Sequence, residues 1–248
     1  MIVENTFKIK KMYPFQFYTN ITSLLFLTTL FHYPLQYINL ENKYFERYSV
    51  NLMRSVSCFM IFTESIDILL NYGFQNHCSS TILQENIDLF YFFLAYIYYD
   101  TVLLIYQHYL GLEKKLRYDL LLHHLLALFS LTFIQNYELY SFIPYICLSE
   151  GISVVSGVKL LANIFKNHKI AKYCILYRIY FLTYFRMALL WPFIIYTFYT
   201  HIDNKECNHE IFNYENLSYV LGSIFMIYSA EYLWYIRGDS ELKMLHSL

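Results

Sequence analysis

Seven long apolar stretches, separated by short polar segments, organise this chain of 248 residues. The stretches cover residues 17–38, 50–72, 87–109, 118–135, 139–163, 174–200 and 214–236. A helix needs about 20 mostly apolar residues to cross the hydrocarbon core of a bilayer, which is about 30 Å thick. The pattern therefore predicts an all-α membrane protein with a bundle of about seven transmembrane helices. Its parts are an N-terminal segment at 1–16, a first helix at 17–38, a domain of six further helices at 50–236 and a tail at 237–248.

Composition agrees with this fold class and narrows the function classes. Hydrophobic residues make up 57% of the chain and charged residues 15%, and the mean hydropathy is +0.33, unlike an ordinary soluble domain. The net charge is −1, and the sequence holds no P-loop, dinucleotide fingerprint or nucleic-acid recognition motif. It also lacks a zinc-type spacing of Cys and His. We therefore expect no nucleic-acid partner, no resident cofactor and no metal site.

The positive charges between the stretches predict the orientation. The segments at 39–49, 110–117 and 164–173 and the tail hold ten Lys and Arg residues, whereas the opposite side holds four. By the positive-inside rule, the C-terminus is cytosolic and the N-terminus luminal. Cys78 and Cys207 then share the luminal side. They form either a disulfide or two free thiols, because sequence alone gives no geometry to decide between these.

A histidine pair inside an apolar stretch is the leading candidate for a functional site. His123 and His124 lie within RYDLLLHHLLALFSLTF, and an imidazole in hydrocarbon costs several kcal/mol unless a partner, a ligand or water satisfies it. Asp119 is four residues before His123 on the same helix face, where it could orient that imidazole for base catalysis. The alternative is that Asp119 caps the helix and the histidines bond to neighbouring helices.

The fifth stretch places an acid beside small residues. Glu150, Ser153 and Gly157 are spaced to share one helix face, which permits either close helix packing, the favoured interpretation, or room for a lipid chain. Glu150 lies near the middle of its stretch and needs a cation or a proton. Arg186 and Arg178 of the next stretch are the first candidates for its partner, followed by the two histidines.

The sixth stretch carries two arginines and a proline. Arg178 and Arg186 are eight residues apart on similar faces, and Pro192 should kink the helix that follows. A guanidinium group can clamp a phosphate or a carboxylate. Pairing with an intramembrane acid is the favoured alternative.

The ordered polar residues resemble the motifs of the TLC-domain family, whose members include the ceramide synthases. The resemblance covers residues 54–237 and is carried, in order, by Arg54 with Ser57, by Asp100 in LAYIYYD, by the pair His123 and His124, by Glu150 with Lys159, by Arg186 with Pro192, and by Glu231, Trp234 and Arg237. Met60 stands where other members have a histidine. In the stretch EGISV, Glu150 and Val154 replace the histidine and the last aspartate of the synthase signature.

This resemblance implies a helical bundle with a lipid-accessible interior, in the endoplasmic reticulum or a related membrane. It implies that the interior is lined by Arg54, Ser57, Asp100, His123, His124, Glu150, Ser153, Arg186 and Glu231. The expected function is the binding or handling of a lipid, without catalysis, in membrane lipid homeostasis. The expected partners are a sphingolipid, a phospholipid or an acyl chain, and a homo-oligomer is left open.

Two alternatives remain. The first is an N-acyltransferase of the ceramide-synthase type, with acyl-CoA as co-substrate and with His123, His124 and Asp119 as catalytic residues. The second is a structural membrane component, suggested by the replaced motif positions Met60, Val154 and Gly157.

Overall fold

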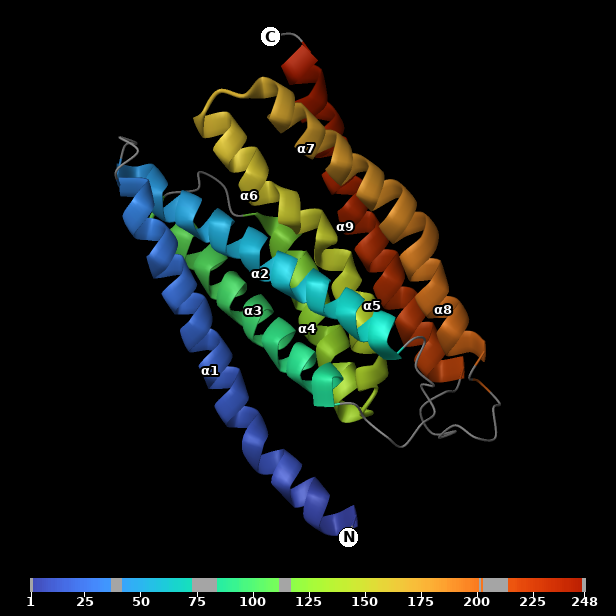
Figure 1. The fold of residues 1–248 in the computed structure, drawn as a ribbon. Coiled ribbons are helices and arrows are strands. Elements are labelled where there is room, and N and C mark those ends of the chain that lie inside the picture. Colours follow the sequence, from blue (N-terminus) through green and yellow to red (C-terminus); the bar gives the residue numbers. More distant parts are fainter. Residues whose placement is uncertain are drawn as a thin grey trace.

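The fold is known from a computed structural model, which describes residues 2–36, 42–72, 84–111, 117–200, 202 and 214–246. Every regular element within these residues is helical (Figure 1). Each of the seven predicted stretches falls on a helix, so the all-α prediction is confirmed. Cys78 and Cys207, for which a disulfide and two free thiols are both open, lie outside the described residues.

The helices are named in chain order. The first four are α1 (Ile2–Gln36), α2 (Asn42–Tyr72), α3 (Gln84–Tyr109) and α4 (Tyr118–Asn136). The fifth stretch combines η1 (Tyr140–Phe142), α5 (Ile143–Cys147), η2 (Leu148–Glu150) and α6 (Gly151–Ile164). The sixth combines α7 (His168–Tyr180), the π-helix η3 (Phe181–Leu190) and α8 (Trp191–Thr200), and the last is α9 (Tyr214–His246). Helices α1 and α9 extend past the predicted stretches into the N-terminal segment and the tail.

Four helical segments of the described residues are long and apolar enough to cross a membrane. They are Gln84–Tyr109, Tyr118–Asn136, Tyr140–Ile164 and His168–Thr200. Large apolar side chains also remain on the outside of the bundle, for example Leu70 at 79% exposure and Phe225 at 72%. Such a surface suits hydrocarbon better than water. Both findings are compatible with an integral membrane protein.

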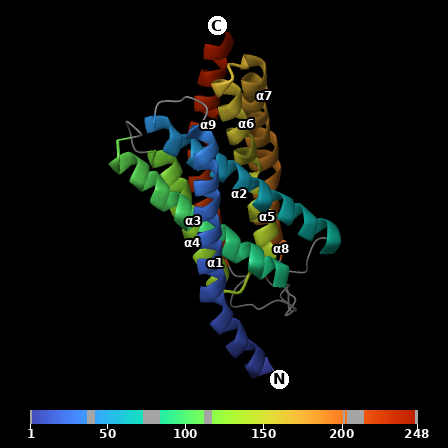
Figure 2. The same cartoon turned by 60° about the vertical axis from the view of Figure 1, so that its left-hand side comes forward.

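The helices form an elongated bundle with two sides (Figures 1 and 2). Helix α1 packs on the outside against α2 and α3, and α2 crosses α6. On the other side, the continuous rod of α7, η3 and α8 runs along α9, which also packs against α4. The interior between α4, α6, η3 and α9 is where the polar residues of the candidate site meet.

Two glycines allow the close approach of neighbouring helices. A Cβ added at Gly157 would lie 2.7 Å from Cβ of Ser55 on α2, and a Cβ at Gly151 would lie 2.7 Å from Cζ of Phe181. Real Cβ atoms essentially never approach other atoms this closely, so a larger residue at either position would force the neighbouring helix or its side chain to shift. The favoured prediction for these small residues, close helix packing, is confirmed.

The π-helix η3 explains how Pro192 is accommodated. Proline has no N–H, so the carbonyl five residues earlier in a π-helix, that of Met187, loses its donor. The hydroxyl of Tyr228 on α9 donates to this carbonyl instead. The proline expected to kink the helix thus follows a widened helical segment, and that segment holds Arg186.

Candidate functional site

The two histidines are adjacent in sequence but serve different neighbours. Their ring centroids are 5.9 Å apart. His124 is 2% exposed and turns toward α3, where its Nδ1 lies 2.9 Å from Oγ1 of Thr101 and its Nε2 lies 3.4 Å from Oδ2 of Asp100. The alternative that the histidines bond to a neighbouring helix is therefore confirmed for His124.

His123 turns away from α3, toward α9 and the start of α6. Its Nε2 lies 4.0 Å from Oε1 of Glu150, and its ring packs against the indole of Trp234 with 5.0 Å between the centroids. His123 is therefore the member of the pair that faces the interior of the bundle.

Asp119 does not orient His123, and that prediction is wrong. Its carboxylate accepts from Nη2 of Arg117 at 2.9 Å, from Nη1 of Arg237 at 2.9 Å and from the indole N–H of Trp234 at 2.9 Å. Trp234 thus contacts both residues, through its N–H to Asp119 and through its ring to His123. Asp119 also does not cap the helix, because the N-cap position of α4 is Arg117.

Glu150 is buried and its nearest cationic candidate is His123. The thiol of Cys58 on α2 donates to Oε2 of Glu150 at 3.4 Å, and the same thiol lies 3.2 Å from the hydroxyl of Tyr96. The predicted partner Arg186 forms its ion pair elsewhere, with Glu231. The other predicted partner, Arg178, lies 3.9 Å from Glu241.

Arg186 and Glu231 form an ion pair in the centre of the bundle. Nη2 of Arg186 lies 2.6 Å from Oε1 of Glu231, and the two side chains are 1% and 0% exposed. The indole N–H of Trp191 donates to both carboxylate oxygens at 3.2 Å. The guanidinium carbon lies 5.7 Å from the ring centroid of Trp191 and 5.9 Å from that of Trp234, within the range of a cation–π contact. For Arg186, pairing with an acid inside the bundle, the favoured alternative, is therefore confirmed.

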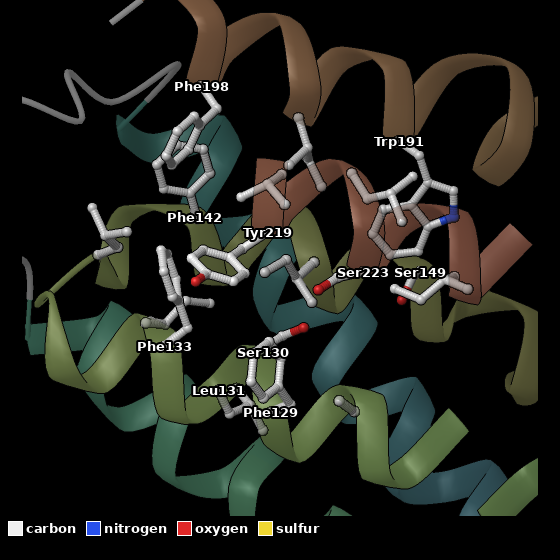
Figure 3. A pocket seen from close by; sticks show the side chains of 18 of the residues that line it. Phe129, Ser130, Leu131, Phe133, Phe142, Ser149, Trp191, Phe198, Tyr219 and Ser223 are labelled. Atoms are coloured by element: carbon white, nitrogen blue, oxygen red, sulfur yellow. The ribbon is translucent and has the colours of Figure 1, made fainter. Parts of the chain in front are cut away.

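These interior residues form what we call the polar layer: His123, Glu150, Arg186, Glu231 and Trp234. One side of the layer borders an apolar cavity of about 110 Å³. Its wall includes Phe133 and Ile134 of α4, Phe198 of α8 and Ile227 of α9, with His123, Glu150 and Trp191 at the polar layer. Figure 3 shows Phe129 and Ser130 of α4 facing Tyr219 and Ser223 of α9, with Phe198 and Trp191 across the space.

A second cavity, of about 270 Å³, borders the other side of the polar layer at Trp234. We call it the basic cavity. Six helices contribute to its wall, which consists of Asn51, Arg54, Tyr96, Asp100, Arg117, Leu120, Ile152, Ser153, Ser156, Lys159, Leu160, Asn163, Arg178, Trp234, Arg237 and Glu241. On the same measure a single water needs about 10–15 Å³, so each cavity has room for a ligand group of several atoms.

The predicted site residues therefore divide into three sets. His123 and Glu150 line the apolar cavity, and Arg54, Asp100 and Ser153 line the basic cavity. His124, Arg186 and Glu231 are buried without lining either of them. Ser57 also lines neither cavity: it is fully buried, and its hydroxyl lies 3.5 Å from the sulfur of Met53.

Two residues of the site were missed from the sequence. The indole N–H of Trp191 donates to the carboxylate of Glu231, and the guanidinium group of Arg117 pairs with the carboxylate of Asp119. The chain has only two tryptophans, and both lie in or beside the polar layer. A rare residue with one N–H donor, in a largely apolar stretch, is the signal that could have found Trp191.

Searches for relatives do not identify the chain. A scan against models of protein families, a search of the curated proteins and a search of the solved structures each find no match. Among the described residues, no group of three or more His, Cys, Asp and Glu side chains is arranged to hold a metal ion. Any functional conclusion therefore depends on the two cavities and the polar layer between them.

Proposed function

We propose that this chain is a membrane protein that binds a lipid, with an acyl chain in the apolar cavity. The observation that carries the proposal is the elongated apolar cavity ending at His123 and Glu150. Its wall follows α4 from His123 to Ile134, and the eleven steps between these residues rise about 16 Å along the helix. A hydrocarbon chain suits such a space, because an apolar cavity does not hold ordered water and an empty one forfeits dispersion contacts.

The rim of the cavity supports entry from the side. Phe129 of α4 is 54% exposed and Tyr219 of α9 is 52% exposed, and both belong to the cavity wall (Figure 3). In a membrane, these outward-facing parts contact lipid tails. An acyl chain can therefore pass between α4 and α9 without first crossing water.

The wider proposal follows from the resemblance to the TLC-domain family. All seven helical stretches would span the membrane, in the endoplasmic reticulum or a related membrane, with the C-terminus in the cytosol. The protein would then act in lipid sensing, transport or control of membrane composition. What supports this is the order of the motif residues, together with the presence of five of them, Asp100, His123, Glu150, Arg186 and Glu231, in or beside the bundle interior.

A matched pair of tryptophan substitutions tests lipid binding. Ser223 lines the apolar cavity, whereas Ser229 lies on the exposed face of the same helix. In Ser223→Trp the indole occupies the cavity, and we expect copurified acyl chains, counted by mass spectrometry, to fall about tenfold. Ser229→Trp should retain them. Equal acyl content in the two variants, both folded, would contradict the proposal.

Acyl transfer is the second candidate, and the position of His123 favours it. An imidazole 4.0 Å from a carboxylate, at the end of an acyl-sized cavity, could take a proton from an amine as the amine attacks a thioester carbonyl. The new C–N bond would replace the C–S bond of acyl-CoA, and coenzyme A would leave as the thiol. Purified protein incubated with labelled acyl-CoA and sphingoid bases decides this. Absence of an N-acyl product across chain lengths rejects the enzyme.

A further inference from the structure

The basic cavity holds more positive charge than its own carboxylates balance. The cationic residues in its wall are Arg54, Arg117, Lys159, Arg178 and Arg237. The carboxylates that contact these five cations are those of Asp100, Asp119 and Glu241. Two positive charges remain without a counter-charge among the described residues. The side chains of Arg54 and Arg178 are 15% and 25% exposed, whereas those of Arg117 and Arg237 are 38% and 44% exposed, so the excess charge is only partly buried. An anion between these cations is favoured because it would pair with the buried part of that charge.

Two of these carboxylates are each shared by two cations, so some N–H donors of the cations have no carboxylate oxygen to themselves. Oδ2 of Asp119 accepts from both Arg117 and Arg237 at 2.9 Å. The carboxylate of Glu241 pairs with Lys159 and lies 3.9 Å from Nη1 of Arg178. Arg117 also donates from its Nε to Oδ1 of Asp119 at 3.1 Å, so it contacts both oxygens of this carboxylate. Each guanidinium carries five N–H donors in a planar fork, so one shared carboxylate cannot satisfy all the donors of two of them.

Arg54 adds an unsatisfied donor in the cavity wall. Its Nε lies 2.5 Å from Oδ1 of Asp100, and its Nη1 lies 3.4 Å from Oδ1 of Asn51. Its Nη2 is buried and has no hydrogen-bond partner among the described residues. A buried donor left unpaired destabilises the fold, so a ligand oxygen at this atom would offset that cost.

The wall is built to hold a compact anion with several acceptor oxygens. Its cations come from α2, α6, α7, α9 and the start of α4, so they surround the space instead of lining one face. Ser153, Ser156 and Asn163 add neutral polar groups. A phosphate group supplies the missing charge and accepts from several guanidinium forks at once, which a single carboxylate does less well.

We infer that the basic cavity binds a phosphate group, and that this phosphate is the headgroup of the lipid whose acyl chain occupies the apolar cavity. Trp234 lines the basic cavity and packs against His123, which lines the apolar one, so the two cavities meet at this ring contact. The lipid source of the phosphate rests on the proposed function. Binding of the anion itself does not.

The test uses the full chain in nanodiscs and two lipids with the same acyl chains, phosphatidic acid and diacylglycerol. We expect the wild type to enrich phosphatidic acid about tenfold over diacylglycerol, because one charge-assisted hydrogen bond contributes at least that factor. Arg178→Gln with Arg237→Gln should abolish the enrichment. This double substitution orphans no carboxylate, since Glu241 keeps Lys159 and Asp119 keeps Arg117.

Lys169→Gln with Lys243→Gln removes the same charge from exposed positions outside the cavity and is the matched control. It should keep the enrichment. Inorganic phosphate, added to delipidated protein in a thermal-shift assay, separates the two sources. A shift with phosphate but no preference for phosphatidic acid would assign the site to a soluble phosphate and overturn the lipid source.

Wild-type protein that takes up both lipids equally and shows no shift with phosphate would overturn the inference. Uptake of the acyl chains of both lipids would still support the proposed function. The reverse result, no uptake of either lipid together with a phosphate shift, would reject the proposed function and leave the anion site intact. Loss of enrichment in the control pair as well would attribute the effect to net charge and overturn the assignment to the cavity.

Discussion

The apolar and the basic cavity share helices α4 and α9, yet they are opposite in character. On α9, Val220, Ser223 and Ile227 face the apolar cavity, and Trp234 and Arg237 face the basic one. These residues are spaced three, four or seven positions apart, so they follow one continuous helix face. Polarity therefore changes along the helix axis and not around it. One side of the bundle interior thereby offers an apolar end and a charged end to a single amphipathic ligand.

The change occurs at the ion pair of Arg186 and Glu231. Its two members are almost completely buried, and they touch both tryptophans. We regard this pair as the boundary that keeps the two cavities distinct. Substitutions in this ion pair should have the largest effects on stability, and substitutions farther from it should have smaller ones.

Removing the cation of the boundary has the largest expected effect. Arg186→Met leaves Glu231 buried without its charge partner, which should cost about 3–5 kcal/mol of stability. For a chain of this size that corresponds to a melting temperature lower by about 10 °C, measured by thermal unfolding in detergent. The double substitution Arg186→Met with Glu231→Leu should recover most of the loss. A single variant as stable as the wild type would show that the pair does not hold the boundary.

The two histidines should separate stability from binding. His124→Ala removes the contacts to Thr101 and Asp100, and the unpaired groups should cost about 1–3 kcal/mol. His123→Ala should destabilise less, because His123 faces the cavity, but it should reduce copurified lipid. Thermal unfolding and lipid mass spectrometry on both variants check this. The opposite order of stabilities would contradict the division of roles.

Trp234 tests the contact between the cavities. Trp234→Phe keeps an aromatic ring beside His123 but loses the N–H that Asp119 accepts. Asp119 retains Arg117 and Arg237, so the expected cost is only about 1 kcal/mol. Chemical or thermal unfolding gives the value. A loss as large as that of Arg186→Met would mean that the indole N–H, and not the ion pair, fixes the boundary.

The surface ion pair near the end of α9 should contribute least to stability and to lipid binding. Lys243 contacts Asp239 at 2.6 Å in an exposed i, i+4 arrangement, and such pairs contribute little. Lys243→Gln should leave both the melting temperature and the lipid content unchanged. A clear change in either measurement would indicate that α9 beyond the basic cavity takes part in the site.

The helices could be predicted from the sequence because apolar length is a local property. Each apolar stretch falls on a helix, and the glycines at 151 and 157 pack closely as their spacing favours. Which side chains pair across helices depends on the tertiary structure, and some of these pairs were predicted wrongly from the sequence. Asp119 is four residues from His123, but it accepts hydrogen bonds from its neighbour Arg117 and from Trp234 and Arg237, 115 and 118 residues away.

Arg186 shows the same limit. Topology favoured Glu150 as its partner, since the two stretches are consecutive. The π-helix η3 and the approach of α9 bring Glu231 to it instead. Helical spacing placed Asp119 and His123 on one face of α4, but it carries no information on how the faces of different helices meet.

A photoreactive phospholipid tests the central claim most directly. A diazirine at the end of its acyl chain should label the part of the apolar cavity farthest from the polar layer, near Phe142, Phe198 and Tyr219. Peptide mass spectrometry after irradiation in nanodiscs locates the label. The account predicts labels at these residues, and fewer of them in Ser223→Trp. Labels confined to outward-facing residues such as Leu70 and Phe225, unchanged by that substitution, would contradict it.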